Sequence, residues 1–370
     1  MKSEPIRVLQ VFICMDRSGV PVMLMNYYRN IDRSKVQFDF AVDSAIEACF
    51  DREIESLGGR IFRIGKSDNS PGYYVKLARI IRKNGYDFIH CHKNFKNMPV
   101  LITALFSGVK NRISHSHNTY QMRGLKSVFS GLIRLINRKM ANVYLACSVQ
   151  AGICLYGKGL HDSGKIRVIN NAMDLSRFEF NEKTRAEVRT SMSIDDKIVI
   201  GHVGNFVLAK NHVFLMDIFR EIHRRNKKTV MLLAGGGRFM EEIKRRVTDF
   251  GLNDDVVFLG SRDDVNRLYQ AFDIMVYPSL NEGLAFVLLE AQASGLPILM
   301  SDVIPDEANA TGMIEKLSLS KSAGTWAEKA MEVLKNSKKR ESKVRELAEK
   351  GFNIYKEAKK LEDLYLRLKG

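Results

Sequence analysis

Residues 281–290, with the sequence NEGLAFVLLE, combine two carboxylates and a glycine at a spacing suited to binding a phosphorylated sugar. They follow an apolar β-like run at 274–277. We predict that Glu282 and Gly283 open a helix, because free N–H groups at a helix N-terminus attract phosphate and glycine permits close approach. Glu290, a little over two turns further on, could hold a ribose while Glu282 holds a sugar. The alternative is an ordinary helix with one dipole-stabilising and one solvated glutamate.

Two groups of histidines end two predicted strands of the first half. They occur in His90-Cys91-His92 and in His115-Ser116-His117-Asn118-Thr119. Binding sites of α/β proteins form at the carboxyl ends of strands. A His-x-His pair shares one face of a strand and could suggest a metal, but no carboxylate or thiolate set completes such a site, so we expect none. Structural histidines and substrate contact both stay open.

The segment 120–139 has apolar residues at helical spacing beside basic ones. The basic residues are Arg123, Lys126, Arg134, Arg138 and Lys139. A basic amphipathic helix is typical of a membrane-surface contact. A core-packed helix with a solvated basic face is the alternative.

The charge of the chain is unevenly distributed. Of 370 residues, 58 are Lys or Arg and 42 are Asp or Glu, a net charge of +16. Residues 1–180 hold 27 basic against 14 acidic residues (+13), and the rest hold 31 against 28 (+3). The first half therefore faces something anionic. Aromatic residues do not interleave with the basic run, which disfavours nucleic acid.

Several classes of protein are disfavoured by simple features. Five cysteines without a CxxC pair are too few for a disulfide scaffold, so we expect reduced thiols in a cytosolic protein. No secretory signal or membrane-spanning stretch is evident, which predicts a soluble or peripheral protein. The turn after the first strand lacks GxGxxG, which disfavours an NAD-dependent enzyme.

Short β-like runs alternate with helical stretches, and the pattern then restarts. Strands are expected near 6–13, 38–42, 60–63, 87–91, 111–115 and 142–147, and again near 198–203, 229–234, 256–259, 274–277 and 298–300. Such alternation predicts two α/β domains of Rossmann type, each with a parallel sheet, facing a central cleft. We place the first at 1–175, the second at 176–350 and a C-terminal helix at 351–370, which we expect to cross back to the first domain.

Several segments in the right order resemble the family 4 glycosyltransferases of GT-B fold. The segment 281–290 continues as AQASGLP, which matches the family's Glu-Gly…Glu signature. Residues 261–274, the interdomain run 169–174 and the Gly-rich turn 233–237 also match. The resemblance implies a retaining, metal-independent transferase that needs no cofactor and uses a nucleotide-diphosphate sugar, with UDP favoured.

The resemblance also implies roles for residues. Lys210 would neutralise the departing diphosphate, Glu282 and His117 would contact the transferred sugar, and Glu290 the ribose. The remaining donor-binding positions are Gly19, Gly204, Asn205, Gly283, Leu284, Ala285 and Phe286, and further sugar or acceptor contacts are His92, His115 and Asn118. Asn205 stands where the family has an arginine, and Ser18 and Pro21 depart from its first loop.

Two hypotheses about function follow. The first is a glycosyltransferase of bacterial surface-polysaccharide biosynthesis, acting on a lipid-diphosphate or saccharide acceptor at the inner face of the cell membrane. The second, motivated by Asn205, Ser18 and Pro21, is a catalytically impaired relative that serves as a membrane-associated binding or partner protein.

Overall fold

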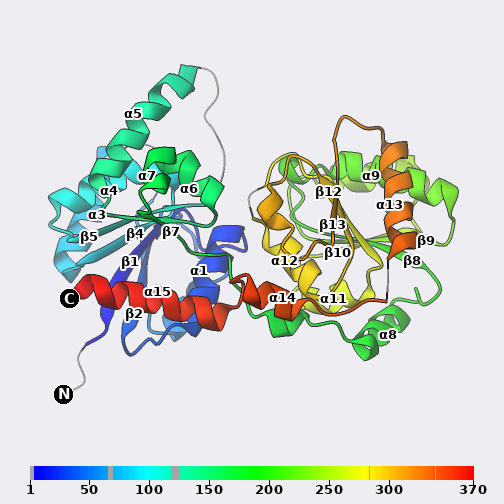
Figure 1. Cartoon of the computed structure of the whole chain (residues 1–370), viewed down its shortest axis with the longest axis horizontal. Coiled ribbons are helices and arrows are strands. Elements are labelled where there is room, and N and C mark those ends of the chain that lie inside the picture. The colour runs from blue at the N-terminus through cyan, green and yellow to red at the C-terminus, as the bar shows by residue number, and fades with distance from the viewer. Residues whose placement is uncertain (1–3, 66–69, 118–124, 283, 338) are drawn as a thin grey trace. The chain divides into compact units, whose positions relative to one another are not determined.

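A computed structural model describes residues 4–65, 70–117, 125–282, 284–337 and 339–370, and of residues 125–130 the backbone alone. The chain divides into two compact units, Met1–Met173 with Gly351–Gly370, and Asp174–Lys350 (Figure 1). Each is an α/β unit with its own sheet.

Seven parallel strands form the sheet of the first unit, in the order β3-β2-β1-β4-β5-β6-β7. They are β1 (Ile6–Phe12), β2 (Val36–Val42), β3 (Ile61–Arg63), β4 (Phe88–Cys91), β5 (Asn111–Ser116), β6 (Val143–Ala146) and β7 (Ile166–Val168). The helices are α1 (Gly19–Asn30), α2 (Asp51–Ser56), α3 (Pro71–Asn84), α4 (Asn97–Phe106), α5 (Leu125–Met140), α6 (Val149–Tyr156) and α7 (Lys158–Asp162). This strand order is that of a Rossmann sheet.

The C-terminal helix belongs to the first unit, as the sequence predicts. After α14 (Val344–Glu349), helix α15 (Ile354–Lys369) returns to contact α1, β1 and β2 (Figure 1). Asn353 caps it by accepting hydrogen bonds from the N–H groups of Tyr355 and Lys356. Its apolar face buries Leu361 and Tyr365 against the sheet, because residues four apart lie on one side of a helix.

The second unit repeats the same topology with six parallel strands, in the order β10-β9-β8-β11-β12-β13. They are β8 (Ile198–Val203), β9 (Thr229–Ala234), β10 (Val256–Gly260), β11 (Ile274–Tyr277), β12 (Ile298–Ser301) and β13 (Ile314–Leu317). Its other helices are α8 (Glu182–Ser191), α9 (His212–Arg225), α10 (Met240–Asp249), α11 (Val265–Ala271), α12 (Phe286–Ala293) and α13 (Ala323–Asn336).

Both faces of this second sheet are covered. Val199 and Ile200, neighbours on β8, belong to two different apolar clusters, because successive strand residues point to opposite faces. Leu268 of α11 lies in the first cluster and Phe219 of α9 in the second. Burial on both faces explains why these strands are continuous apolar runs in the sequence.

The expected strands are all present, but five further elements were not predicted: helices α4, α7 and α8 and strands β7 and β13. Helix α4 has no charged residue and therefore no polar face to reveal its period. Helix α8 is almost entirely polar and is held by ion pairs from Arg185 and Arg189 to Asp273. The edge strands β7 and β13 are short and carry charged residues, which obscure an apolar run.

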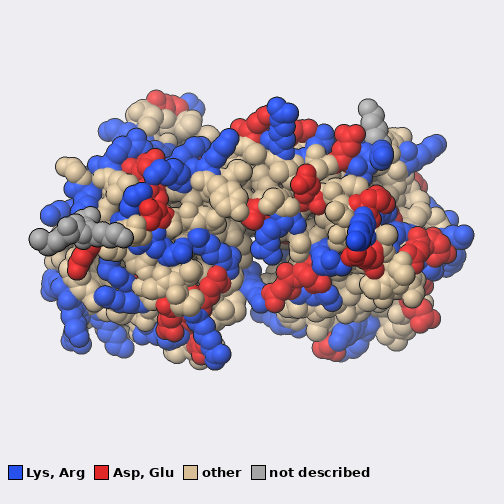
Figure 2. Space-filling view, turned by 90° about the horizontal axis from the view of Figure 1, so that it is seen from below, with Lys and Arg blue, Asp and Glu red and all other residues tan. Residues whose placement is uncertain are grey.

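Charge also distinguishes the two units. Figure 2 shows Lys and Arg spread over the visible face of the first unit (left), whereas Asp and Glu are more often interspersed on the second. Within the described residues, no helix is long and apolar enough to cross a membrane.

Candidate functional site

The segment 281–290 starts its helix later than predicted. Helix α12 begins at Phe286, and Ala285 at its N-cap has an extended backbone (φ −75°, ψ 128°). Glu282 therefore lies in the loop after β11, and Glu290 is four residues from the helix start rather than two turns beyond Glu282. The prediction that Glu282 and Gly283 open the helix is wrong, because the helix starts only after Ala285, which is extended and packs with Leu284 against the core. Gly283 itself lies outside the described residues.

Glu290 is held by a tyrosine from the preceding helix. Oη of Tyr269 donates to Oε2 of Glu290 at 2.8 Å. Burial raises the pKa of Glu290 to about 7, against the lowering effects of Tyr269 and Arg177. Its second carboxylate oxygen has no hydrogen bond among the described residues, which makes it an available acceptor.

Lys210 and Glu282 are brought together by tertiary structure. Lys210 ends the 3-10 turn η3 (Leu208–Lys210), and its Nζ donates to Oη of Tyr277 and to Oε1 of Glu282. Nζ also lies 4.8 Å from the centre of the Tyr277 ring. Burial opposes the charge of Lys210, but attraction to Tyr277 and Glu282 outweighs it, so the pKa of Lys210 lies above its usual value.

Backbone contacts fix the loops that carry this pair. The N–H of Leu280 donates to the carbonyl of Ala209 at 2.8 Å, and Nδ2 of Asn211 donates to the carbonyl of Pro278 at 3.1 Å. Asn211 takes the left-handed conformation (φ 55°) that asparagine tolerates. Lys210 and Glu282 are thus positioned by bonds that involve neither side chain.

Two glycines let the turn after β9 approach the loop after β8 closely. A Cβ on Gly235 would lie 2.1 Å from the carbonyl oxygen of Gly204, and one on Gly237 would lie 2.6 Å from that of Phe206. Only glycine fits at these contacts. They leave Asn205 exposed beside Gly204 at the carboxyl end of β8. Gly204, Asn205, Lys210 and Glu282 therefore share one edge of the second sheet.

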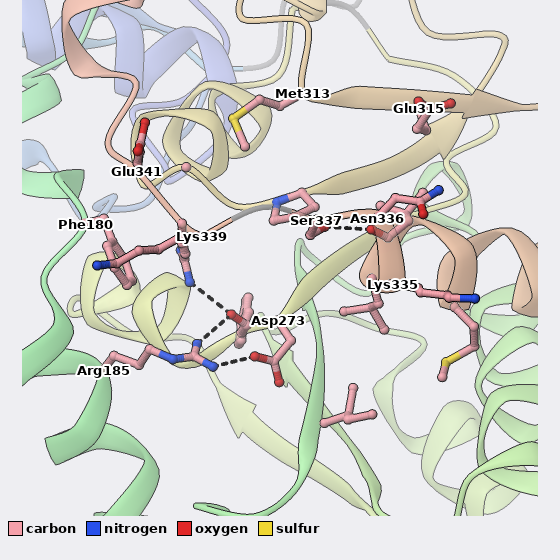
Figure 3. A pocket seen from close by; sticks show the side chains of 18 of the residues that line it. Phe180, Arg185, Asp273, Met313, Glu315, Lys335, Asn336, Ser337, Lys339 and Glu341 are labelled. Atoms are coloured by element: carbon pink, nitrogen blue, oxygen red, sulfur yellow. Dashed lines mark hydrogen bonds and ion pairs between the residues drawn. The ribbon is translucent and has the colours of Figure 1, made fainter.

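A pocket of about 1130 Å³ occupies the opposite edge of this sheet. Figure 3 shows Arg185 pointing toward Asp273, beside Phe180 and Lys339. It lies where β8 and β11 begin, since Ile198 and Asp273 line it. None of the predicted site residues that the structure describes lines this pocket, so it is separate from the candidate site.

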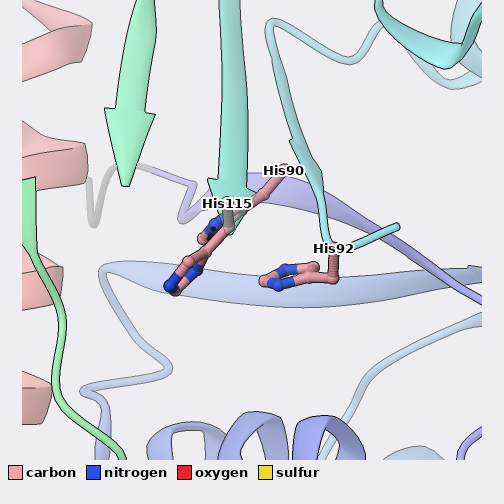
Figure 4. Close-up of side chains that lie close together, drawn as sticks. All are labelled: His90, His92 and His115. Atoms are coloured by element: carbon pink, nitrogen blue, oxygen red, sulfur yellow. Dashed lines mark hydrogen bonds between the residues drawn. The ribbon is translucent and has the colours of Figure 1, made fainter. Parts of the chain in front are cut away.

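Four histidines of the first unit, His90, His92, His115 and His117, form one cluster at the carboxyl ends of β4 and β5. Nε2 of His90 lies 3.1 Å from Nδ1 of His115, and Nδ1 of His92 lies 2.9 Å from Nε2 of His117. Figure 4 shows the rings of His90, His92 and His115 gathered at these strand ends. Burial lowers the pKa of all four, that of His117 to about 3, so all are neutral near pH 7.

The cluster has the ligand types of a metal site but not convergent ligands. Nitrogens of His90, His92 and His115 all lie within 4.8 Å of one another. Yet the rings of His90 and His115 are almost parallel (9°) and their nitrogens face each other across a hydrogen bond. In a metal site, the lone pairs of the ligand nitrogens would instead point toward one common ion. The expectation that no metal binds stays a prediction.

Other predicted residues are distributed unevenly. Gly19 begins α1, where a Cβ would meet nothing within 4 Å, so space does not require glycine there. Arg138 and Lys139 are exposed on α5, whereas Arg134 is partly buried. Asn118 and Arg123 lie outside the described residues, as does the side chain of Lys126.

Sequence reasoning missed the partners that orient the site. Tyr277 and Tyr269 hold Lys210 and Glu290, and Gln10 and Tyr365 contact the histidines. For Tyr277 and Gln10, only a position near the end of a strand could have suggested such a role. Tyr365 occupies an apolar position of the C-terminal helix, and nothing in the sequence marks it as a contact of the histidines.

Comparison with known proteins identifies the class. Residues 17–177 match the family described as Glycosyltransferase Family 4, and residues 197–336 match the one described as Glycosyl transferases group 1. HepE of Anabaena, solved in complex with UDP-glucose, aligns with a TM-score of 0.79 at 16% identity, over 98% of this chain and 99% of that one. The two Rossmann-like units are those of a GT-B fold, as predicted.

Sequence similarity to known proteins shows the family of the chain. EpsF of Bacillus subtilis strain 168, which carries the name of a glycosyltransferase, is 36% identical over 99% of this chain and 97% of its own. The UDP-Gal:alpha-D-GlcNAc-diphosphoundecaprenol alpha-1,3-galactosyltransferase of Escherichia coli is 26% identical over 79% of this chain and 78% of its own. The chain belongs to glycosyltransferase family 4.

Proposed function

We propose that the protein transfers a sugar from a UDP-sugar to a lipid-diphosphate-linked or saccharide acceptor, with retention at the anomeric carbon. The observation that carries the proposal is the grouping of Lys210, Glu282 and Tyr277 at the carboxyl edge of the second sheet. A cation beside a sugar-binding carboxylate suits a reaction in which negative charge develops on a leaving diphosphate. The HepE structures were solved with UDP and with UDP-glucose.

Each residue has a distinct role in this proposal. Lys210 exchanges Glu282 for the diphosphate, which frees the Glu282 carboxylate to accept hydrogen bonds from sugar hydroxyls. Glu290, oriented by Tyr269, accepts from the ribose hydroxyls. His117 contacts the transferred sugar. No metal or other cofactor takes part, because Lys210 supplies the charge that stabilises the leaving group.

The acceptor and the place of action are proposed from the names of two relatives and from basic residues of the first unit. The E. coli relative is named for a diphosphoundecaprenol-linked acceptor, and CapH of Staphylococcus aureus, 22% identical, is named for capsular polysaccharide biosynthesis. We extend both to this chain: it works peripherally at the cytoplasmic face of the membrane, in surface-polysaccharide biosynthesis. Arg138 and Lys139 on α5 contribute to that contact, and nucleic acid is not a partner.

Thermal unfolding with UDP, GDP and ADP tests the donor site. A ligand at about 100 times its Kd should add roughly 2.7 kcal/mol to the free energy of unfolding. We expect UDP to raise the melting temperature, Glu290→Ala to abolish the rise, and Glu328→Ala, which alters an exposed carboxylate of the same unit, to retain it. No response to any nucleotide would contradict the proposal.

Asn205 favours a second candidate, a relative that binds the donor without turnover. It is exposed and neutral at the edge that holds the diphosphate, and the nearby Lys210 is paired with Glu282. An amide cannot replace an arginine fork. Under this candidate, Asn205→Arg raises transfer from the sugar nucleotide; under the first, it leaves transfer unchanged or lowers it.

A further inference from the structure

The histidine cluster is connected on its buried side to Gln10 and Tyr365. Oε1 of Gln10 lies 2.8 Å from Nε2 of His92, and Nε2 of Gln10 donates to Oη of Tyr365 at 3.4 Å. Oη of Tyr365 lies 2.7 Å from Nδ1 of His90. Gln10, on β1, and Tyr365, on α15, are both about 1% exposed or less, so water does not compete for these bonds.

The Gln10 carbonyl determines the tautomers of one arm of the cluster, which consists of His92 and His117. A carbonyl oxygen only accepts, so Nε2 of His92 must carry a proton. Because burial keeps His92 neutral, its Nδ1 is then an acceptor and must receive a proton from Nε2 of His117. Nδ1 of His117 is left unprotonated, and no hydrogen bond engages it among the described residues.

Tyr365 determines the tautomers of the second arm, which consists of His90 and His115. Its oxygen accepts from Gln10, and within the described part of the chain His90 is the acceptor in reach of its proton. The hydroxyl therefore donates to Nδ1 of His90, whose Nε2–H donates to Nδ1 of His115. Nε2 of His115 then carries a proton, is buried, and has no partner within the described residues. An unpaired buried donor is costly unless a ligand satisfies it.

We propose that Gln10 and Tyr365 are positioning residues that hold four histidines in one set of tautomers, so that Nδ1 of His117 accepts and Nε2–H of His115 donates. The inference rests on the proposed function in one respect: a hydroxyl-bearing ligand, the sugar, is what donates to His117. The amide of Gln10 couples the two arms, since turning it by 180° would reverse every donor and acceptor along both.

The tautomers are directly measurable in the full-length protein labelled with ¹⁵N-histidine. Two-bond proton–nitrogen correlation spectra distinguish Nδ1–H from Nε2–H, and single His→Asn variants assign the signals. We expect Nε2–H at His90, His92, His115 and His117. A proton on Nδ1 of His117 in the unaltered protein would overturn the inference.

Two variants separate the arms. Gln10→Leu should leave all four histidines as tautomer mixtures, because it removes the amide that couples the two arms. Tyr365→Phe should do so for His90 and His115 only, because the Gln10 carbonyl still accepts from His92. Tyr28→Phe is the matched control, because it removes a hydroxyl that donates to the carbonyl of Leu57 at 3.1 Å and contacts no histidine. Identical spectra for all three variants would also contradict the inference.

Kinetics distinguish this inference from the proposed function. Gln10→Leu should lower kcat for transfer by about 10-fold to 100-fold, with the KM for the sugar nucleotide within about twofold, because the diphosphate contacts of the proposal lie in the second unit. The UDP-dependent rise in melting temperature should persist in this variant. The expected tautomers without any response to UDP would contradict the proposed function alone, whereas a UDP response with the wrong tautomers would contradict the inference alone.

Discussion

At the scale of single residues, the cation of the candidate site is already neutralised by a carboxylate. Lys210 donates to Glu282, and the side chains of both are about 15% exposed. Removing one partner of a mostly buried ion pair leaves the other partner with an unpaired charge. A bound diphosphate therefore has to compete with Glu282 for Lys210. The hydroxyls of a bound sugar then have to donate hydrogen bonds to Glu282 in place of the lost ion pair.

Glu282→Gln separates these two effects. The variant should bind UDP alone several-fold more tightly, because the competing carboxylate is gone, and yet transfer sugar more slowly, because an amide is a weaker acceptor for sugar hydroxyls than a carboxylate. Calorimetric titration with UDP and a transfer assay measure the two quantities. Glu328→Gln serves as the control, and weaker UDP binding by Glu282→Gln would contradict the competition.

Glu290 makes donor binding depend on pH. Burial raises its pKa to about 7, so the carboxyl is mostly protonated below that pH and ionised above it. The ionised form accepts from two ribose hydroxyls and the protonated form from fewer, so the Kd for UDP should fall by up to about 10-fold between about pH 6 and 8. Comparison with Glu290→Gln corrects for titration of the nucleotide itself. Parallel pH profiles would show that Glu290 does not titrate in this range.

At the scale of elements, the site depends on how closely backbone segments approach. The turn after β9 passes Gly204 at a distance that leaves no room for a side chain at Gly235. Gly235 also has φ 149°, a conformation that residues with a Cβ rarely adopt. Close packing of this kind holds the loop after β8 in place without any side chain.

Gly235→Ala should therefore destabilise the protein by at least ~2 kcal/mol and abolish the response to UDP. Urea unfolding and the UDP-dependent shift in melting temperature measure the two effects. Gly159→Ala is the control, because a Cβ there meets nothing within 4 Å and its φ is negative. Equal stability of the two variants would mean that the loop moves aside at little cost.

At the scale of the whole molecule, the excess of basic over acidic residues is concentrated on the first unit. Exposed apolar side chains accompany it: Phe106 at the end of α4 is 76% exposed, and Leu132 on α5 is 55% exposed. Exposed apolar and basic residues on neighbouring helices are typical of proteins that bind a membrane surface. This composition supports the peripheral location proposed above.

Binding to vesicles tests that location. The protein should sediment with phosphatidylglycerol vesicles and not with phosphatidylcholine vesicles, and added salt should release it. The double variant Arg138→Glu and Lys139→Glu should weaken binding by roughly 10-fold or more. The double variant Arg52→Glu and Arg345→Glu, at exposed positions on α2 and α14, changes the net charge by the same amount and is the matched control. An equal loss in both would mean that net charge alone acts.

The sequence by itself determined the two sheets, all their strands except β7 and β13, and the family, because continuous apolar runs and ordered motifs are local features. It also predicted His117, Lys210, Glu282 and Glu290 as site residues, and these roles stay predictions. It misplaced the start of α12, since the extended backbone at Ala285 depends on packing against the core.

Only the tertiary structure decided what those residues contact. Lys210 meets Glu282, 72 residues away, and His90 meets Tyr365, 275 residues away. No periodicity encodes such pairs, because each depends on which strand ends and helices are brought side by side. The chemistry of the site arises from these contacts: they set the charge that Lys210 presents and the ring nitrogens that carry protons.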